Sequence, residues 1–565
     1  MTPNVLDALP QREGSAFPFR RAWLSVFSLG VACGGSAAPA NAPQPAPAAA
    51  AGSSSRDVAP ESEAGMERGR LPRDTRPTAE ALVLSIDPKS DQLAGVADID
   101  VVVDRARRTL WMHGKDLKIS RATITPRGGE PVEAEWRQVD PGGAGTLTLA
   151  RAIPAGTATV HVEYAAALGE RRHMTQGASY VVAQLEPIEA RAVFPCFDEP
   201  SFKIPFDVTI VTPRGNEVIS NSQEARRTDE VDRGAGPLRA DRTAPELPRD
   251  VRRRAVRRRP GARPRAPWPS DAAPRASSDY GEGRGPEAAY ALASVGPLLG
   301  ILEDYFGLEY PFEKLDLIAV PGGNGSLENP GAVTFAEAKL LLDPTHASVA
   351  SKRGFARTMA HELAHQWVGD LVTAAWWDDI WLNEAFATFV GSRAADRWDP
   401  STAAQTDLLR DVQSVMGADS LESTPSIRAK VSSTDDIVGA LGSRVDAKGA
   451  AVLVMFERLV GDEVFRRGLR TYLEAHRFGA AVAEDFLTSE SIAAGWDVAS
   501  AMRTFLDQSG SPFSMPSSTA TATRSCTSRN RASYLSARVG RWTGRGSCRS
   551  SCATVSVIGS SRPRH

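Results

Sequence analysis

In the first half of the chain, hydrophobic and polar residues alternate with a period of two. The clearest runs are 81–87 (ALVLSID), 94–104 (AGVADIDVVVD) and 157–166 (TATVHVEYAA), which proline and glycine turns separate. This period is typical of strands that bury one face and expose the other. We therefore predict an antiparallel β domain, a sandwich or a saddle, over residues 79–227.

The pattern changes to a helical period at about residue 286. Residues 288–306 form an amphipathic run that ends before Gly307, a suitable C-cap, and residues 314–320 (KLDLIAV) resemble a short buried strand. Helical patterning continues through 449–476 and 498–510. The chain is thus predicted to be an α+β multidomain protein whose second domain, residues 286–514, is mostly helical.

Two histidines stand out inside the helical part. His361 and His365 are four residues apart, so on a helix they lie one turn apart on the same face. An apolar stripe recurs every fourth residue beside them and predicts that the imidazoles point away from the core, toward a cavity. The stripe consists of Phe355, Met359, Leu363 and Trp367.

Two carboxylates complete a candidate metal site. Glu362 follows His361 directly, and Glu384 comes eighteen residues after His365, in a second helical run preceded by the possible caps Asp378 and Asp379. Two imidazoles and one carboxylate, with a fourth position for water, are the ligands of a catalytic zinc. Zinc would lower the pKa of that water toward ~7, and Glu362 would act as general base.

The residues around this site resemble a known family. HELAHQWVGD followed by WLNEAFA is similar to the gluzincin metallopeptidases of the M1 aminopeptidase family, whose signature is HExxH, eighteen residues, then Glu. Residues 305–335 resemble that family's strand and substrate loop, and residues 184–210 the end of its amino-terminal domain. The resemblance covers about 79–225 and 288–513, and it implies a thermolysin-like catalytic domain with one Zn²⁺ per chain.

The resemblance also implies roles for residues around the metal. Glu328, in the loop with Gly325 and Asn329, would hold the free α-amine of a peptide by a charge-assisted hydrogen bond, which makes the enzyme an aminopeptidase. Gln184 and Glu186 would reach into the cleft from the β domain. From the sequence alone, the less favoured alternatives are that Glu328 is an exposed loop residue and that Gln184 and Glu186 are ordinary polar groups of a strand.

One position departs from the family pattern. Where M1 enzymes have a tyrosine that stabilises the oxyanion, this chain has Asp446, and no tyrosine occurs between Tyr310 and Tyr472. Loss of one oxyanion donor typically costs ~2.7–4 kcal/mol in the activation barrier. We therefore expect zinc to bind normally and peptidase activity to be weakened.

Composition limits the other function classes. A net charge of −2 gives no reason to expect a nucleic-acid partner. Five cysteines include no CxxC pair, so neither a disulfide framework nor a zinc cluster is expected.

The amino terminus resembles an export signal. Arg20 and Arg21 precede a short apolar run, residues 22–32, and then Cys33, in a setting similar to the bacterial lipoprotein box. Residues 1–33 are therefore predicted to be a signal peptide and 34–78 a disordered Ala/Pro/Ser-rich linker. The expected location is outside the cytoplasm: periplasmic, secreted, or attached to a membrane through a lipidated Cys33. The alternative is a disordered or misassigned leader on a cytoplasmic enzyme.

Two segments follow neither period. Residues 228–285 are rich in arginine and proline, and residues 515–565 contain no Asp or Glu. For residues 228–285, a basic, disordered insertion that binds polyanions is one interpretation. The other, which we favour, is that both segments are read out of frame. The further helical domain of many M1 members is expected to be absent.

Two functions from different classes therefore remain. The first is a zinc aminopeptidase that removes neutral or basic N-terminal residues from peptides. The second is an inactive M1-like zinc-binding protein or a frame-disrupted gene remnant. Epoxide hydrolysis, known in one branch of the family, has no specific support in these residues.

Overall fold

The structure is a computed structural model of the 565-residue chain. It describes residues 23–25, 69–168, 174–176, 180–227, 275–277, 285–323, 325–421, 423–510, 512–515 and 527–530. Most of the predicted signal peptide including Cys33, most of the predicted linker, and most of segments 228–285 and 515–565 lie outside these residues. The described part contains no helix that is both long enough and apolar enough to cross a membrane.

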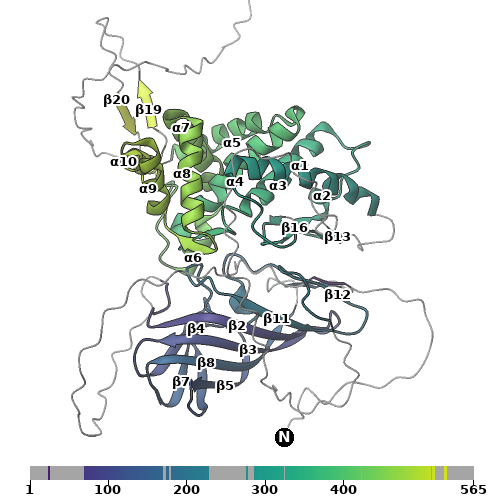
Figure 1. Ribbon diagram of the computed structural model, residues 1–565, viewed down its shortest axis with the longest axis vertical. Coiled ribbons are helices and arrows are strands. Elements are labelled where there is room, and N and C mark those ends of the chain that lie inside the picture. The colour runs from purple at the N-terminus through teal and green to yellow at the C-terminus, as the bar shows by residue number, and fades with distance from the viewer. Residues whose placement is uncertain are drawn as a thin grey trace, which may run out of the picture. The chain divides into compact units, whose positions relative to one another are not determined.

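The first domain is a curled eight-stranded sheet with the order β11-β2-β3-β8-β5-β6-β7-β4 (Figure 1). Neighbouring strands are antiparallel except at the β11 edge, where β11 runs parallel to β2. Its strands are β2 (Thr75–Ser85), β3 (Gln92–Val103), β4 (Arg107–His113), β5 (Lys118–Pro126), β6 (Val132–Gln138), β7 (Ala144–Ile153), β8 (Gly156–Ala167) and β11 (Phe206–Val211). Short pieces nearby are β1 (Trp23–Ser25), β9 (Met174–Gln176), β10 (Val181–Ala183), η2 (Ala190–Ala192) and β12 (Glu217–Ile219).

The predicted alternation along these strands is confirmed. Successive residues of β3 and β8 alternate between buried and more exposed positions, and the buried ones form one core. The domain begins earlier than predicted, however. Leu71 is 2 % exposed and belongs to this core, and β2 begins at Thr75. Prolines and a register shift between Pro77 and Ala79 obscured the alternation there.

The second domain is mostly helical, as predicted. Its helices are η4 (Gly285–Ala288), α1 (Ala289–Phe306), α2 (Glu337–Leu340), α3 (Val349–His365), η5 (Trp377–Asp379), α4 (Trp381–Trp398), η6 (Pro400–Thr402), α5 (Ala404–Asp419), α6 (Thr434–Ala440), η7 (Arg444–Lys448), α7 (Gly449–Val460), α8 (Asp462–Ala475), α9 (Ala483–Ala494) and α10 (Val498–Leu506). Its strands are β13 (Arg275–Ser277), β14 (Asp316–Val320), β15 (Ser326–Leu327), β16 (Ala332–Ala336), β17 (Val372–Ala374) and β18 (Gly479–Ala481).

Three local predictions can be compared with these elements. Gly307 caps α1 in the left-handed region, at φ 65°, which confirms the predicted C-cap. The predicted helical run 449–476 is helical and is divided into α7 and α8 at Gly461, which has φ 92° and ends α7. The predicted caps of α4 are wrong: Asp378 and Asp379 lie within η5, and Ile380 occupies the N-cap.

Beyond these two domains, residues 511–565 form a separate unit. Its described residues are the antiparallel pair β19 (Pro512–Met515) and β20 (Thr527–Asn530).

Candidate metal centre

Helix α3 presents both histidines of the predicted site. The helix begins at an N-cap, Ser348, whose side chain accepts a hydrogen bond from the Ser351 backbone N–H. The apolar stripe predicted from the sequence is buried in the core of the helical domain, with Phe355, Met359, Leu363 and Trp367 each at most 3 % exposed. The opposite face therefore carries His361 and His365 toward α4.

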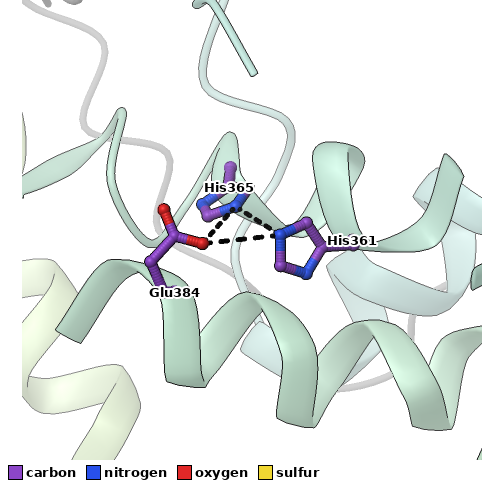
Figure 2. A group of neighbouring side chains, drawn as sticks. All are labelled: His361, His365 and Glu384. Atoms are coloured by element: carbon purple, nitrogen blue, oxygen red, sulfur yellow. Dashed lines mark hydrogen bonds and ion pairs between the residues drawn. The ribbon is translucent and has the colours of Figure 1, made fainter. Parts of the chain in front are cut away.

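Helix α4 brings Glu384 to the same point. The two helices approach closely at Gly391, where an added Cβ would lie 2.9 Å from the backbone of His361. Nε2 of His361 lies 3.6 Å from the Glu384 carboxylate, and Nε2 of His365 lies 3.8 Å from it (Figure 2). The two Nε2 atoms are 3.0 Å apart. Residues far apart in the sequence thus converge as the spacing predicted.

This donor set fits zinc. One ligand atom from each of the three residues lies within 4.8 Å of the others, and two imidazoles with one carboxylate form a common catalytic zinc set. The other ring nitrogens are already engaged, as metal-bound histidines require. Nδ1 of His365 lies 2.5 Å from Asn383 Oδ1, and Nδ1 of His361 lies 3.3 Å from Thr388 Oγ1.

A second group of possible ligands shares one histidine with the first. Glu328, Glu362 and His365 also lie within 4.8 Å of one another. The Glu328 carboxylate lies 3.5 Å from Nδ1 of His365, the nitrogen that contacts Asn383 at shorter range. The first group is therefore the better metal site, and Glu328 and Glu362 lie beside it.

A cavity of about 320 Å³ opens at this site and is strongly acidic. Six carboxyl groups line it: Glu186, Asp198, Glu199, Glu328, Glu362 and Glu384. Burial, followed by the charge of Glu328, raises the pKa of Glu186 to about 8. Burial and the same Glu328 charge raise the pKa of Glu362 well above its usual value. A cavity with these mutual repulsions favours cations.

The histidines respond to the same environment in opposite directions. Burial, with the neighbouring His365, lowers the pKa of His361 to about 3, so that imidazole is neutral. Burial also acts to lower the pKa of His365, but Glu328, Glu384 and other carboxylates outweigh it and raise that pKa to about 10. Positive charge is therefore stabilised on His365 and disfavoured on His361.

The other predicted site residues occupy different positions. Gln184 is half-buried and is not among the residues that line the cavity. Asn329 is buried and its amide donates within its own loop, to Ala332 O at 3.3 Å and to Thr334 Oγ1 at 3.4 Å. Gly325 accepts a hydrogen bond from the Ala336 backbone N–H. These last two residues shape the loop that presents Glu328.

Asp446 lies in a second cavity, of about 470 Å³, which His361 and Glu362 also line. It belongs to η7, a single π-helical turn that leads into α7. Burial, followed by the charge of Glu384, raises the pKa of Asp446 to about 6. The chain thus has a carboxyl group in the cavity where the resemblance expects a phenol.

Comparison with known proteins identifies both domains. Residues 290–505 match the peptidase family M1 domain, and residues 76–235 match the peptidase M1 N-terminal domain. Both domains of the chain belong to the M1 peptidase family. M1 peptidases are zinc metalloenzymes, and the histidines and glutamate described above are residues that could bind that metal.

Relatives within the M1 family are named aminopeptidases. Aminopeptidase M1-A of Oryza sativa subsp. japonica is 30% identical over 471 residues, 80% of this chain and 53% of the relative. Glutamyl aminopeptidase of Bos taurus is 30% identical over 493 residues, 80% of this chain and 49% of the relative. Probable aminopeptidase 1 of Saccharolobus solfataricus is 33% identical over 338 residues, which are 60% of this chain and 42% of the relative. The chain spans about half the length of these M1 relatives.

Sequence reasoning missed two residues that hold this M1 site together. Gln366 donates from its amide nitrogen to Glu328 O at 2.6 Å, and its Oε1 accepts from the Gly331 N–H at 3.1 Å. Asn383 donates to the Glu328 carboxylate at 3.2 Å while it contacts His365. Gln366 follows His365 directly, and Asn383 precedes Glu384 directly. This adjacency to candidate metal ligands was the signal in the sequence that could have identified them.

A lysine of the β domain was also missed. The Lys203 side chain is half-buried, and its ammonium donates to the Asp370 carbonyl at 2.6 Å and to Thr373 Oγ1 at 2.8 Å. Burial lowers its pKa to about 7. Lys203 lines the acidic cavity and connects the first domain to the loop that follows α3.

Proposed function

We propose that this protein is a zinc-dependent aminopeptidase that hydrolyses N-terminal residues from peptides. One observation carries the proposal: two imidazole nitrogens and the Glu384 carboxylate converge beside Glu362, inside a cavity whose other acidic residues suit a free amine. A zinc ion held by His361, His365 and Glu384 would supply an acidified water and polarisation of the scissile carbonyl.

The protein's own groups account for the remaining steps. Glu362 accepts a proton from the attacking water and returns it to the leaving amine. Glu328 and Glu186 bind the substrate's α-ammonium by charge-assisted hydrogen bonds. Since that ammonium must reach these carboxylates, only the first peptide bond would lie at Glu362.

Asp446 supports a second candidate function. A carboxylate in this cavity cannot donate a hydrogen bond to a developing oxyanion unless it is protonated, and when ionised it repels that charge. The alternative is therefore an M1-like protein that binds zinc and peptides but turns over slowly or not at all.

Zinc content and hydrolysis of aminoacyl-anilides separate the two functions. For the peptidase, we expect about one zinc per chain, loss of activity with a chelator, and recovery when zinc is added. Glu362→Gln should retain zinc and lose turnover, whereas Glu463→Gln, an exposed residue of α8, should retain both. Zinc binding without turnover that depends on Glu362 would favour the binding protein instead.

The location of the protein is a further proposal. We infer export from the Arg20–Arg21 pair and the apolar run before Cys33. Fractionation of cells with a labelled precursor tests it: a shortened protein outside the cytoplasm supports export, and a full-length cytoplasmic one overturns it.

A further inference from the structure

The second cavity contains cationic side chains that the proposed mechanism does not use. Lys339 and Arg357 line it, together with His361 and Glu362. Arg357 lies on α3 one helical turn before His361, so the two side chains share a face of that helix. Lys339 comes from α2 and is exposed to solvent. This cavity therefore combines the reacting residues with two positive charges.

The two cavities meet at the candidate general base, because His361 and Glu362 line both of them. The first cavity holds the carboxylates suited to an α-ammonium. If the scissile bond lies at Glu362, the residue before it occupies the first cavity and the leaving part occupies the second. A volume of about 470 Å³ is within the ordinary range of small-ligand sites.

The two cations differ in how far they are neutralised. Arg357 is ion-paired with Asp411 of α5 and lies 4.0 Å from Asp407. Within the described part of the chain, Lys339 has no hydrogen bond or ion pair. Its side chain lines the same cavity as Glu362. Lys339 is therefore the available counter-charge for an anion.

Three carboxyl groups also line this cavity, Glu362, Asp411 and Asp446. Asp411 is paired with Arg357, and within the described residues none of the three forms an ion pair with Lys339. Asp446 lies on η7, and its carboxylate is close enough to Glu384 and His361 for their charges to shift its pKa. Leu408 and Val415 of α5 give the cavity an apolar wall that an aliphatic side chain can contact.

We propose that the second cavity binds the C-terminal carboxylate of a short peptide, an inference that rests on the proposed aminopeptidase function. Lys339 is the main counter-charge and Arg357 lies beside it. The substrates are then di- and tripeptides, in which a free carboxylate lies within one or two residues of the scissile bond. Longer peptides place an uncharged backbone in the same cavity and lose this contact.

The experiment compares peptides that differ only at the C-terminus. Dissociation constants of Leu-Leu and Leu-Leu amide are measured by calorimetry with zinc-loaded Glu362→Gln protein, so that no peptide is cleaved. Because Lys339 is exposed, we expect the free acid to bind about three- to tenfold more tightly than the amide at low salt. Lys339→Gln should bring this ratio near one, and Lys339→Glu should reverse it.

Matched controls make the result specific to Lys339. Lys352→Gln and Lys352→Glu change the same charge on α3, away from the cavity lining, and should leave the ratio unaltered. N-acetylation of the peptide should weaken binding equally whether or not the protein carries Lys339→Gln, since it acts at the other cavity. An unaltered ratio in both Lys339 variants, or no preference in the starting protein, overturns the proposal.

This test does not depend on turnover. If the protein with Glu362 intact fails to hydrolyse any anilide, the proposed peptidase function is wrong. The ratio of the dissociation constants of Leu-Leu and Leu-Leu amide would still show whether the second cavity binds a carboxylate. If hydrolysis is found, the ratio of kcat/KM for Leu-Leu and its amide should follow the same order across the variants.

Discussion

Oδ1 of Asn383 lies 2.5 Å from Nδ1 of His365. The amide nitrogen of the same side chain donates to the Glu328 carboxylate at 3.2 Å. A single buried amide therefore contacts both a candidate zinc ligand and the carboxylate proposed to bind the α-amine. Because an amide has one accepting and one donating end, it fixes the orientation of the imidazole and of the carboxylate together.

Substitutions at Asn383 should separate these two contacts. Asn383→Asp keeps an oxygen for His365 but replaces the donor to Glu328 with a like charge. We expect zinc affinity to be largely retained and KM for peptides to rise about tenfold or more. Asn383→Ala removes both contacts and should also lower zinc affinity by about 10–100-fold. Zinc competition assays and steady-state kinetics provide the two measurements.

Equal zinc affinities of Asn383→Asp and Asn383→Ala, or a lower affinity of Asn383→Asp, would contradict this assignment. If Asn383→Asp lost zinc as readily as Asn383→Ala, the contact with His365 would not be the one that orients the metal ligand. Circular dichroism of both variants is the control for folding.

Gly391 allows α3 and α4 to approach where the metal ligands meet. A Cβ at this position would lie 2.9 Å from both Cα and N of His361, so Gly391→Ala must move the helices apart. We expect a loss of about 1–3 kcal/mol in the free energy of unfolding and weaker zinc binding, because His361 moves away from Glu384. Denaturant titration of the zinc-free protein and zinc competition measure the two effects.

Gly417 provides the matched control for this substitution. It lies within α5, and a Cβ there would meet no atom within 4 Å. Gly417→Ala should stabilise the protein by about 0.5–1 kcal/mol through the unfolded chain and leave zinc affinity unchanged. If Gly391→Ala and Gly417→Ala changed stability and zinc affinity equally, the close approach of α3 and α4 at Gly391 would not contribute to either.

Much of the fold followed from periodicity, because a buried face imposes a regular pattern on the sequence. The alternation in β3 and the stripe that contains Met359 both led to correct elements. The start of the β domain was missed because Pro77 interrupts the alternation. The apolar pattern of 449–476 runs through Gly461 and does not record the break between α7 and α8 there. These features depend on backbone conformation, which hydrophobicity does not record.

The candidate metal centre was predictable to a different extent. His361 and His365 share a helical face by local geometry alone, whereas the convergence of Glu384 with them needed the family's spacing. The contacts of Gln366 and Lys203 connect segments more than 30 residues apart, and no local pattern encodes them. Only the packed structure shows which backbone carbonyl each side chain reaches.

Asp446 allows a direct test of the weakened oxyanion site. We expect Asp446→Tyr to raise kcat by up to ~10²–10³, because a phenol can donate to the oxyanion and a carboxylate repels it. Asp446→Asn removes the charge without adding a phenol and should give a smaller gain. Steady-state kinetics on an aminoacyl-anilide, with zinc content as the control, measures both. No difference between the Tyr and Asn variants would place the oxyanion elsewhere.

Glu490 makes stability depend on pH at a point outside the zinc site. Its side chain is buried, 1 % exposed, against Gly468 of α8, and burial raises its pKa from 4.5 to about 9, partly offset by Arg467. The folded protein thus holds a proton that the unfolded chain releases above pH ~4.5. Its contribution to stability is complete below that pH and is lost as pH rises toward 9.

Glu490→Gln should remove this dependence. Because of Glu490 alone, the free energy of unfolding of the parent protein is expected to fall by on the order of 1 kcal/mol per pH unit between pH 5 and 9. The variant should therefore gain stability relative to the parent at pH 8 and little or none at pH 5. Glu463→Gln, at an exposed position of α8, should leave the slope unchanged. Urea titrations at several pH values measure it, and equal slopes for parent and Glu490→Gln would mean that Glu490 is ionised in the folded protein.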